Sequence, residues 1–525
     1  MIPKPPFAAD LTPERELAEF ERLKLRLPDL WNALTAREEE PYTSVVVPSM
    51  TLDPDEIAKI EAADFYEERL LFLLIRLRNP HAHMVYVTSR PVHPLILDYY
   101  LHLLAGVPAS HARSRLTLLC AHDSSPKPLT QKILDRPRLI QRIRYGIPDA
   151  SRAFLTVFNA TPIERTLAVL LGIPLNGVDP ELRHWGTKSG GRRIFREAGV
   201  TMPEGSEDIH TPEDVVSALT ELERRRPGVR RAVVKLNEGF SGEGNATFTF
   251  PKAEGDRKAM EKALRTVRYG VADERFARFF EKLQRMGGVV EEHLEGTDVQ
   301  SPSAQLRIDP QGGVVCLSTH DQILGGPNGH VFLGCRFPAG DDYRLAIQDA
   351  ACRIGQALAR HGVVSRFGVD FLARRAGPGE PWSLHALEIN LRIGGTTHPF
   401  LALQFLTGGC LDPATSLFHS PRGTPLCYRS TDNLKSDAYR GLLPEDLLDL
   451  VAVNRLQYDH VAERGILFHM MGAVSQYGKL GMTAIASSHA EVDAIYDNAL
   501  AVLDRETAPI GTPRVARKVQ EAPAR

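Results

Sequence analysis

The 525-residue sequence lacks several features that would place it in a specialised class of protein. Its longest aliphatic and aromatic run, residues 70–75, is far shorter than the roughly 20 residues that a membrane-spanning helix needs. Lysine plus arginine (63) nearly equals aspartate plus glutamate (65), so the basic excess of a nucleic-acid-binding domain is absent. Residues 1–6 also lack the apolar stretch of a secretory signal. We therefore expect a cytoplasmic globular protein with no membrane or nucleic-acid partner.

Cysteine is scarce, and several familiar motifs are missing. The six cysteines include no Cys-x-x-Cys pair, which argues against a zinc knuckle and favours reduced, buried thiols. No Gly-x-Gly-x-x-Gly follows a predicted strand in the first part of the chain, and no Gly-x-Ser-x-Gly occurs. The sequence therefore gives no support for a dinucleotide fingerprint or for the nucleophile elbow of a hydrolase.

Short β-rich runs alternate with helical stretches at the start of the chain. A helix is expected over residues 55–78, and Thr161 with Glu164 forms a capping-box signature. Strands alternating with helices predict a largely parallel sheet, so we expect an α/β protein whose residues 1–180 form a Rossmann-like domain. The predicted strands of this domain are 45–47, 84–87, 116–119 and 154–158.

From residue 181 onward, glycine-rich turns separate the predicted strands. We expect a second α/β unit over residues 181–425, with a capping box at Thr211 and a long charged helical region over 254–286. A smaller α/β extension is expected over residues 426–525, with a hairpin-like stretch in 466–485. The strands predicted for the second unit are 232–236, 289–294, 314–319, 331–337, 367–372 and 384–391.

A glycine-rich loop lies between two of these strands. Gly239, Gly242 and Gly244, with Ser241 among them, can bring backbone N–H groups close to phosphate oxygens. Lys235, on the entering strand, can direct its ammonium to the same phosphates. A bulged hairpin with a solvent-exposed lysine explains this pattern equally well.

The strongest pattern is a set of polar side chains in two otherwise apolar strands. Glu388, Asn390 and Arg392 share one face of their strand because side chains alternate with a period of two, and Asp370 projects likewise from the neighbouring strand. Two carboxylates and an amide oxygen are the hard ligands that suit Mg²⁺ on nucleotide phosphates. The competing interpretation is a salt-bridged surface with Arg366 and Arg392 as partners. We favour the metal site.

Residues 394–399 join the second of these strands to a helix predicted over 400–406. Pro399 suits the first helical position, and Thr397 or His398 suits the cap. The free N–H groups of such a helix start favour a carboxylate or an acyl phosphate. Capping alone is the better explanation of His398.

Together these motifs resemble the ATP-grasp superfamily, and more closely its branch that includes the peptide ligase of pheganomycin biosynthesis. The resemblance covers nearly the whole chain and is most specific at residues 186–193, 235–246 and 387–399. It implies a pre-ATP-grasp Rossmann-like domain, an ATP-grasp domain and a C-terminal extension.

The resemblance also implies roles for individual residues. Lys188 and Lys235 would be the two lysines that reach the phosphates of ATP. The three oxygen-bearing residues of the paired strands would hold Mg²⁺, which Mn²⁺ could replace. Arg392 would face the transferring phosphate, and it is our choice over Arg366 as the arginine that stabilises the developing charge.

Residues 290–298 resemble the family's hinge. Glu291 and the backbone of Leu294 would contact adenine, and Asp298 would contact the ribose where a glutamate is more usual. Because Glu292 directly follows Glu291, a hinge register shifted by one residue stays open.

The function implied is an ATP-dependent carboxylate–amine (peptide) ligase that forms an acyl phosphate and releases ADP and phosphate. Its partners would be a small-molecule carboxylate and an amine or peptide, and the sequence leaves a homo-oligomer open. A small-molecule kinase and a non-catalytic nucleotide-binding regulator are the alternatives. The full set of acidic residues and lysines argues against the regulator, which needs fewer of them.

Overall fold

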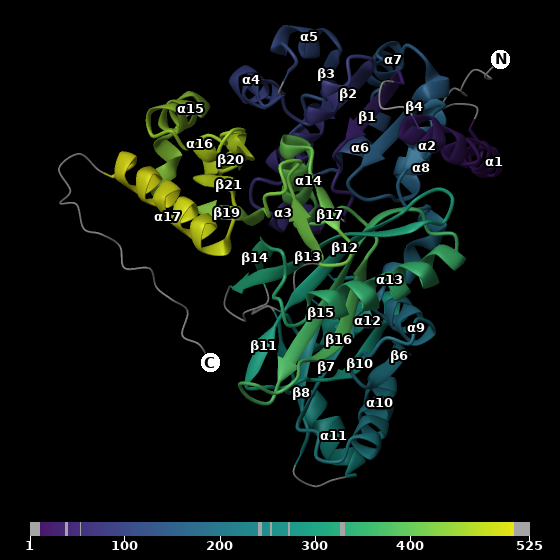
Figure 1. Cartoon of the computed structure of the whole chain (residues 1–525). Coiled ribbons are helices and arrows are strands. Elements are labelled where there is room, and N and C mark those ends of the chain that lie inside the picture. The colour runs from purple at the N-terminus through teal and green to yellow at the C-terminus, as the bar shows by residue number, and fades with distance from the viewer. Residues whose placement is uncertain are drawn as a thin grey trace.

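The computed structural model describes residues 11–36, 40–52, 54–104, 106–239, 244–251, 255–270, 274–325 and 331–508 (Figure 1). Its N-terminal sheet lies at the top of Figure 1, antiparallel sheets fill the centre and lower part, and the last helix runs along the left. The predicted α/β class is confirmed. In the described part of the chain, no helix is both long and apolar enough to cross a membrane.

The N-terminal sheet is parallel and has the order β3-β2-β1-β4-β5. Alternate residues of its strands pack on opposite faces: Val45 and Val85 pack with one set of helices, and Val46 and Met84 with another. The predicted parallel sheet and the capping box at Thr161 are confirmed. The strands are β1 (Tyr42–Val47), β2 (Ala82–Thr88), β3 (Leu116–Cys120), β4 (Ala153–Val157) and β5 (Leu175–Asn176).

The helices of this region follow the alternating pattern with one exception. The single helix predicted over 55–78 is wrong, because α3 (Pro54–Lys59) ends before the left-handed Ala62 and a 3₁₀ segment, η2 (Ala63–Arg78), follows. Residues 70–75 are all buried, so η2 packs as a core element rather than as an amphipathic surface helix. The other helices are α1 (Pro13–Lys24), α2 (Leu27–Ala36), α4 (Pro94–His102), α5 (Ala109–Ser114), α6 (Leu129–Leu134), α7 (Pro137–Tyr145) and α8 (Pro162–Leu171).

A second sheet, with the order β6-β10-β7-β8-β9, forms the lower part of Figure 1. The predicted capping box at Thr211 is present. The single helical region predicted over 254–286 is wrong, since β9 separates two helices there. The elements are β6 (Gly205–Ile209), β7 (Arg231–Leu236), β8 (Asn245–Thr249), β9 (Arg268–Tyr269), β10 (Gly288–Glu292), α10 (Pro212–Arg225), α11 (Arg257–Leu264) and α12 (Phe276–Met286).

The largest sheet runs in the order β11-β15-β12-β13-β14-β19-β21-β20, with β16 paired to β15. Because β19 pairs with β14, the C-terminal segment continues this sheet rather than forming one of its own. The strands are β11 (Asp298–Gln300), β12 (Pro302–Ile308), β13 (Val314–Gly325), β14 (Val331–Phe337), β15 (Ser365–Arg375), β16 (Ser383–Asn390), β19 (Cys427–Lys435), β20 (Gly465–His469) and β21 (Lys479–Ala486).

The predicted hairpin within 466–485 is confirmed as the antiparallel pair β20 and β21. The boundaries at 180 and 425 stay predictions. The remaining elements are η4 (Pro180–Gly186), α9 (Lys188–Glu197), α13 (Arg344–Arg360), α14 (Thr397–Thr407), β17 (Cys410–Asp412), β18 (Leu417–His419), α15 (Pro444–Val453), α16 (Val474–Tyr477) and α17 (His489–Glu506), with short 3₁₀ turns η3 (Ala150–Arg152), η5 (Asp437–Gly441) and η6 (Met471–Ala473).

Helix α14 begins earlier than the sequence predicts. Thr396 occupies the cap position, so the predicted caps Thr397 and His398 lie inside the helix and Pro399 is its third residue. Proline is tolerated there because the first N–H groups of a helix have no intrahelical acceptor. The early start buries Thr397, whose hydroxyl donates to Gln305 of β12 at 2.7 Å.

Buried charged groups of η2 join the N-terminal sheet to the C-terminal segment. Glu68 accepts a hydrogen bond from the backbone N–H of Gly472 at 3.0 Å, and Arg69 donates to Asp432 of β19 at 3.1 Å. Both η2 side chains are buried. Polar contacts inside the molecule therefore link η2 to the C-terminal segment.

Glu68 should make the stability of the protein depend on pH. Burial raises the pKa of Glu68 to about 7, and the hydrogen bond from Gly472 offsets this only in part. A carboxyl group with a raised folded-state pKa stabilises most below its ordinary pKa of 4.5, and this contribution is lost between pH 4.5 and 7. Glu68→Gln should therefore gain about 3 kcal/mol of unfolding free energy relative to the wild type between pH 4.5 and pH 8.

Urea unfolding at several pH values measures this difference. Glu281→Gln, at an exposed position of α12, is the matched control. It retains Glu68, so its unfolding free energy should follow that of the wild type across this pH range. A Glu68→Gln profile parallel to that of the wild type would contradict the raised pKa.

Candidate active site

Two carboxylates face each other across neighbouring strands. The antiparallel pairing of β15 and β16 places Asp370 opposite Glu388, and Asn390 lies opposite Gly368 one pair further along the same face. Asn390 donates through Nδ2 to Asp370 Oδ2 at 2.9 Å. The structure therefore brings together all three residues predicted to bind metal.

Helix α9 brings a lysine to this pair. Lys188 is its first residue, and its Nζ lies 2.5 Å from Glu388 Oε1. Thr187 caps the helix by accepting from the N–H of Gly190 at 3.0 Å. Gly190 must lack a side chain, because a Cβ there would collide with the carbonyl oxygen of His184. Gly190 thus allows the close approach of His184 at the helix start that carries Lys188.

The two carboxyl groups differ in their proton affinity. Burial, followed by the negative charge of Glu388, raises the pKa of Asp370 to about 7, against the opposing charges of Arg392 and Lys188. Burial also acts to raise the pKa of Glu388, but the charge and hydrogen bond of Lys188 outweigh it, so that pKa lies below its ordinary value. A divalent cation between the two groups would relieve their mutual repulsion. The donor set therefore fits Mg²⁺.

Sequence reasoning missed one residue of the site. Gln322 donates through Nε2 to Asp370 Oδ1 at 2.9 Å, so both oxygens of this carboxylate are held in place. Gln322 lies beyond Thr319, where the predicted strand ends, whereas β13 continues to Gly325. The alternation of a longer strand was the only signal that could have located it.

Arg392 lies between the carboxylates and the N-terminal sheet. Its Nη1 donates to the carbonyl oxygen of Ile393 at 3.3 Å, and its guanidinium carbon is 5.9 Å from the ring centre of Phe158. Burial lowers the pKa of Arg392, while the charges of Glu388 and Asp370 oppose that shift. The side chain is positioned next to the predicted metal ligands.

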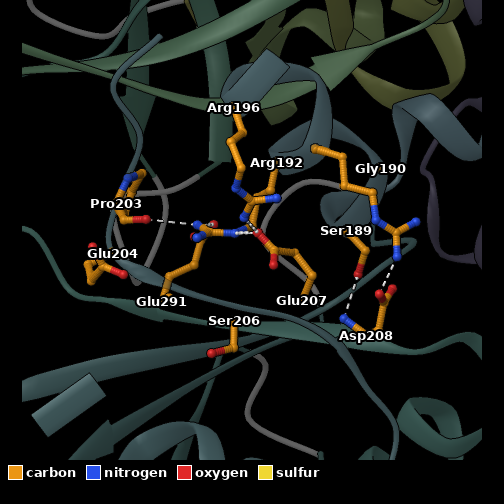
Figure 2. Close-up of polar contacts among 12 residues, drawn as sticks. Ser189, Gly190, Arg192, Arg196, Pro203, Glu204, Ser206, Glu207, Asp208 and Glu291 are labelled. Atoms are coloured by element: carbon orange, nitrogen blue, oxygen red, sulfur yellow. Dashed lines mark hydrogen bonds and ion pairs between the residues drawn. The ribbon is translucent and has the colours of Figure 1, made fainter. Parts of the chain in front are cut away.

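A second buried ion pair lies on the neighbouring sheet. Lys235 of β7 donates to Glu291 Oε2 of β10 at 2.5 Å, and Arg192 of α9 donates to Glu291 Oε1 at 2.9 Å. Figure 2 shows Arg192 reaching Glu291, Glu207 and the carbonyl oxygen of Pro203. Although burial acts to raise the pKa of Glu291, the charges of Lys235 and Arg192 outweigh it, so that pKa is lowered.

The two lysines approach the same region. The charge of Lys235 contributes to lowering the pKa of Glu388, which Lys188 contacts directly. Asn237, directly after β7, accepts hydrogen bonds from the backbone of Lys188 and Ser189 at 3.3 and 2.9 Å. The end of β7 and the start of α9 are therefore connected, and both lysines lie close enough to Glu388 for their charges to lower its pKa.

The remaining hinge residues have partners of their own. Glu292 accepts from the backbone N–H of Glu204 at 2.9 Å, Asp298 pairs with Arg375 at 2.7 Å, and Leu294 is half-buried. Their predicted contacts with adenine and ribose stay predictions.

The glycine-rich loop is only partly described. Gly239 is exposed, and Gly244 has a positive φ of 86° that favours glycine. Ser241 and Gly242 lie outside the described residues.

A third group of ionisable residues is buried nearby. His398 and His469 both contact Asp432 Oδ1, at 3.0 and 2.7 Å, and their Nε2 atoms are 3.1 Å apart. Such donors suit a transition metal by type. Here Arg69 supplies a cation to the second oxygen of Asp432 at 3.1 Å, so the group is explained as a hydrogen-bonded link between α14, β19 and β20.

Glu291 should be essential for stability. Glu291→Gln removes the charge that two buried cations share, and breaking a buried ion pair in this way costs about 3–5 kcal/mol of unfolding free energy. Urea denaturation measures the loss.

The matched control is Glu295→Gln, which weakens more exposed pairs with Arg230 and Arg231. It should cost about 1 kcal/mol or less. Equal effects of the two variants would contradict the role assigned to the buried pair.

Family models match two parts of the chain. The model described as IQCH-like, ATP-grasp matches residues 180–268 and 257–414, and the model of the PGM1 C-terminal domain matches residues 446–499.

Two curated relatives are similar over most of the chain. The L-propargylglycine–L-glutamate ligase of Streptantibioticus cattleyicolor is 32% identical over 445 residues, which covers 83% of this chain and 89% of that protein. The IQ motif-containing protein H of Danio rerio is 24% identical over 78% of this chain. This chain spans 42% of the length of the Danio rerio protein.

Solved structures share the fold. Biotin carboxylase from Campylobacter jejuni, solved as an ATP complex, aligns with a TM-score of 0.51 at 13% identity, covering 88% of this chain and 91% of that one. The biotin carboxylase domain of 2-oxoglutarate carboxylase from Hydrogenobacter thermophilus, solved with MgADP, ADP and bicarbonate, has the same TM-score and identity and covers 87% and 89%. The expected fold is therefore confirmed as biotin-carboxylase-like.

Proposed function

Because the chain belongs to the ATP-grasp family, we propose that it is an ATP-dependent ligase that joins a carboxylate to an amine. The observation that carries this proposal is the carboxylate pair Asp370 and Glu388, faced by Lys188 and Arg392. This arrangement suits the handling of a charged phosphoryl group.

The reaction has two steps. An oxygen of the substrate carboxylate attacks the γ-phosphorus of ATP, the bond to the β–γ bridging oxygen breaks, and ADP leaves. The amine then attacks the acyl carbon, phosphate departs with the acyl oxygen, and the amine loses a proton as the amide forms. Both steps need positioning and charge stabilisation more than covalent participation of the protein.

The side chains divide this work by their charge. Asp370, Glu388 and Asn390 would hold Mg²⁺, which neutralises phosphate charge when bound. Lys188 and Lys235 would contact the phosphates. In the structure each lysine is paired with a buried or partly buried glutamate, so its ammonium is already oriented before the nucleotide arrives.

Arg392 would stabilise the charge that develops on the transferred group. Its guanidinium is close enough to the carboxylates to affect the pKa of both, and it makes a single protein hydrogen bond among the described residues. The remaining N–H groups are therefore available to an anion.

The substrates are proposed to be amino acids. The Streptantibioticus cattleyicolor relative is named for a ligase of two amino acids, and the similarity extends over most of both chains. A screen of ADP release over pairs of amino acids with Mg-ATP, followed by mass spectrometry, tests this proposal. An amide product with ADP and phosphate supports it, whereas a stable phosphorylated product would contradict it in favour of a kinase.

Lys235 and Glu388 should both be required for turnover. Lys235→Ala or Glu388→Ala removes one preorganised charge and should lower kcat about a hundredfold or more. The control Lys258→Ala changes an exposed lysine of α11 and should leave kcat unchanged. Wild-type ADP release by Lys235→Ala or Glu388→Ala would remove that residue from the mechanism.

A further inference from the structure

A second feature lies beside the proposed catalytic centre. A cavity of about 110 Å³ lies between the N-terminal sheet and the large antiparallel sheet. The end of β4 and the residues after it (156–160) line one side, and the start of β15 and the residues after β16 line the other. Four arginines line this cavity, which we call the arginine pocket: Arg76, Arg307, Arg366 and Arg392.

The arginines of the pocket have few protein partners. Arg76 Nη1, Arg307 Nε and Arg366 Nη1 are buried nitrogen atoms with no hydrogen-bond partner. Asp309 is the one acidic residue among the described residues that line the pocket, and its Oδ1 accepts from the backbone N–H groups of Gln311 and Gly313. A buried cation without a partner is costly, so the pocket carries positive charge that the protein itself does not balance.

The strand register places two of these arginines side by side. Arg307 of β12 lies directly opposite Arg366 of β15, and like charges in a cross-strand pair are destabilising. Burial, and then the charges of Arg307 and Arg76, lower the pKa of Arg366 to about 9. Cation–π contact of Arg307 with Trp31, at 4.5 Å, compensates for only part of this repulsion. An anion in the pocket would remove it.

The position of the pocket connects it to catalysis. Arg392 lines the pocket and also lies close to Glu388 and Asp370, whose charges oppose the lowering of its pKa by burial. A substrate whose anionic end lies among the other three arginines would therefore place its remaining atoms near Arg392.

We propose that the arginine pocket binds the non-reacting carboxylate of a dicarboxylic amino acid, whose other carboxylate is thereby directed toward Arg392, where it is activated. This assignment rests on the proposed ligase function and adds the substrate class. The guanidinium group matches a carboxylate in shape and charge and can bind it with two parallel hydrogen bonds. A volume of about 110 Å³ corresponds to about four water molecules, which suits a carboxylate on a short chain.

Direct binding tests the pocket without catalysis. Glutarate carries two carboxylates and no amine, and glutaramate replaces one carboxylate with an amide. By isothermal titration calorimetry at constant ionic strength, glutarate should bind the wild-type protein at least tenfold more tightly than glutaramate, since hydrogen bonds to charged groups are the stronger ones. Arg366→Met and Arg307→Met should each weaken glutarate binding tenfold or more, and Arg366→Lys should restore part of it.

Two controls separate binding from folding. Arg138→Met, at an exposed position of α7, should bind glutarate as the wild type does. Arg366→Met and Arg307→Met should melt at or above the wild-type temperature, because each removes an unpaired cation. A marked fall in Tm in both variants would show that the arginines are structural and would overturn the proposal.

The remaining outcomes are also decisive. Inorganic phosphate binding as tightly as glutarate would overturn the carboxylate assignment, and so would glutarate binding that neither arginine variant weakens. In the ligase assay, Arg366→Met should raise the KM for glutamate tenfold or more and leave the KM for ATP unchanged. If no amino-acid pair gives ADP although glutarate binds in the predicted way, the ligase function fails while the anion pocket stands.

Discussion

The placement of two carboxylates on neighbouring strands is the constraint on which this site depends. Asp370 and Glu388 are held opposite each other by the register of β15 and β16, and they cannot move apart without breaking that pairing. Burial, and then their repulsion, raise the pKa of Asp370 to about 7, and nearby cations offset part of this rise. Lys188 and Arg392 do so in part, and a divalent cation would complete the balance.

The cationic side chains around the site differ in whether the protein supplies them with a partner. On the side of α9 and β7, Lys188 and Lys235 are each paired with a glutamate, so those lysines are neutralised and oriented. On the side of the N-terminal sheet, Arg76, Arg307 and Arg366 each have a buried nitrogen atom without a hydrogen-bond partner. A cavity with one sign of charge and low-dielectric walls attracts ligands of the opposite sign. The pocket therefore differs in charge balance from the region around Lys188 and Lys235.

Local patterns in the sequence predicted the centre of the site. A period of two places Glu388 and Asn390 on one face, and a short connection brings Asp370 beside them, so their convergence follows from neighbouring residues alone. The capping boxes at Thr161 and Thr211 are equally local, and both are present. The partner of Lys188, in contrast, lies 200 positions away, and only the family resemblance indicated that this lysine belongs to the site.

The features that the sequence did not reveal depend on tertiary contacts. Residues 63–78 form a 3₁₀ segment that is buried over residues 67–75, and periodicity alone could not distinguish this from a helix. The pairing of β14 with β19, which extends the large sheet into the C-terminal segment, joins strands about 90 residues apart. Arg76, Arg307 and Arg366 come from three separate elements, so no spacing in the sequence predicts the arginine pocket.

Binding of Mn²⁺ in the presence of ADP, followed by electron paramagnetic resonance, tests the central claim most directly. At a fixed ADP concentration that leaves part of the Mn²⁺ free, adding the wild-type protein should lower the free Mn²⁺ signal further, and Glu388→Gln should weaken this protein-dependent binding tenfold or more while the protein stays folded, since a charged oxygen ligand is lost. Mn²⁺ binding that is equally tight in the wild type and in Glu388→Gln would show that the carboxylates of β15 and β16 do not hold a cation, and would contradict the account.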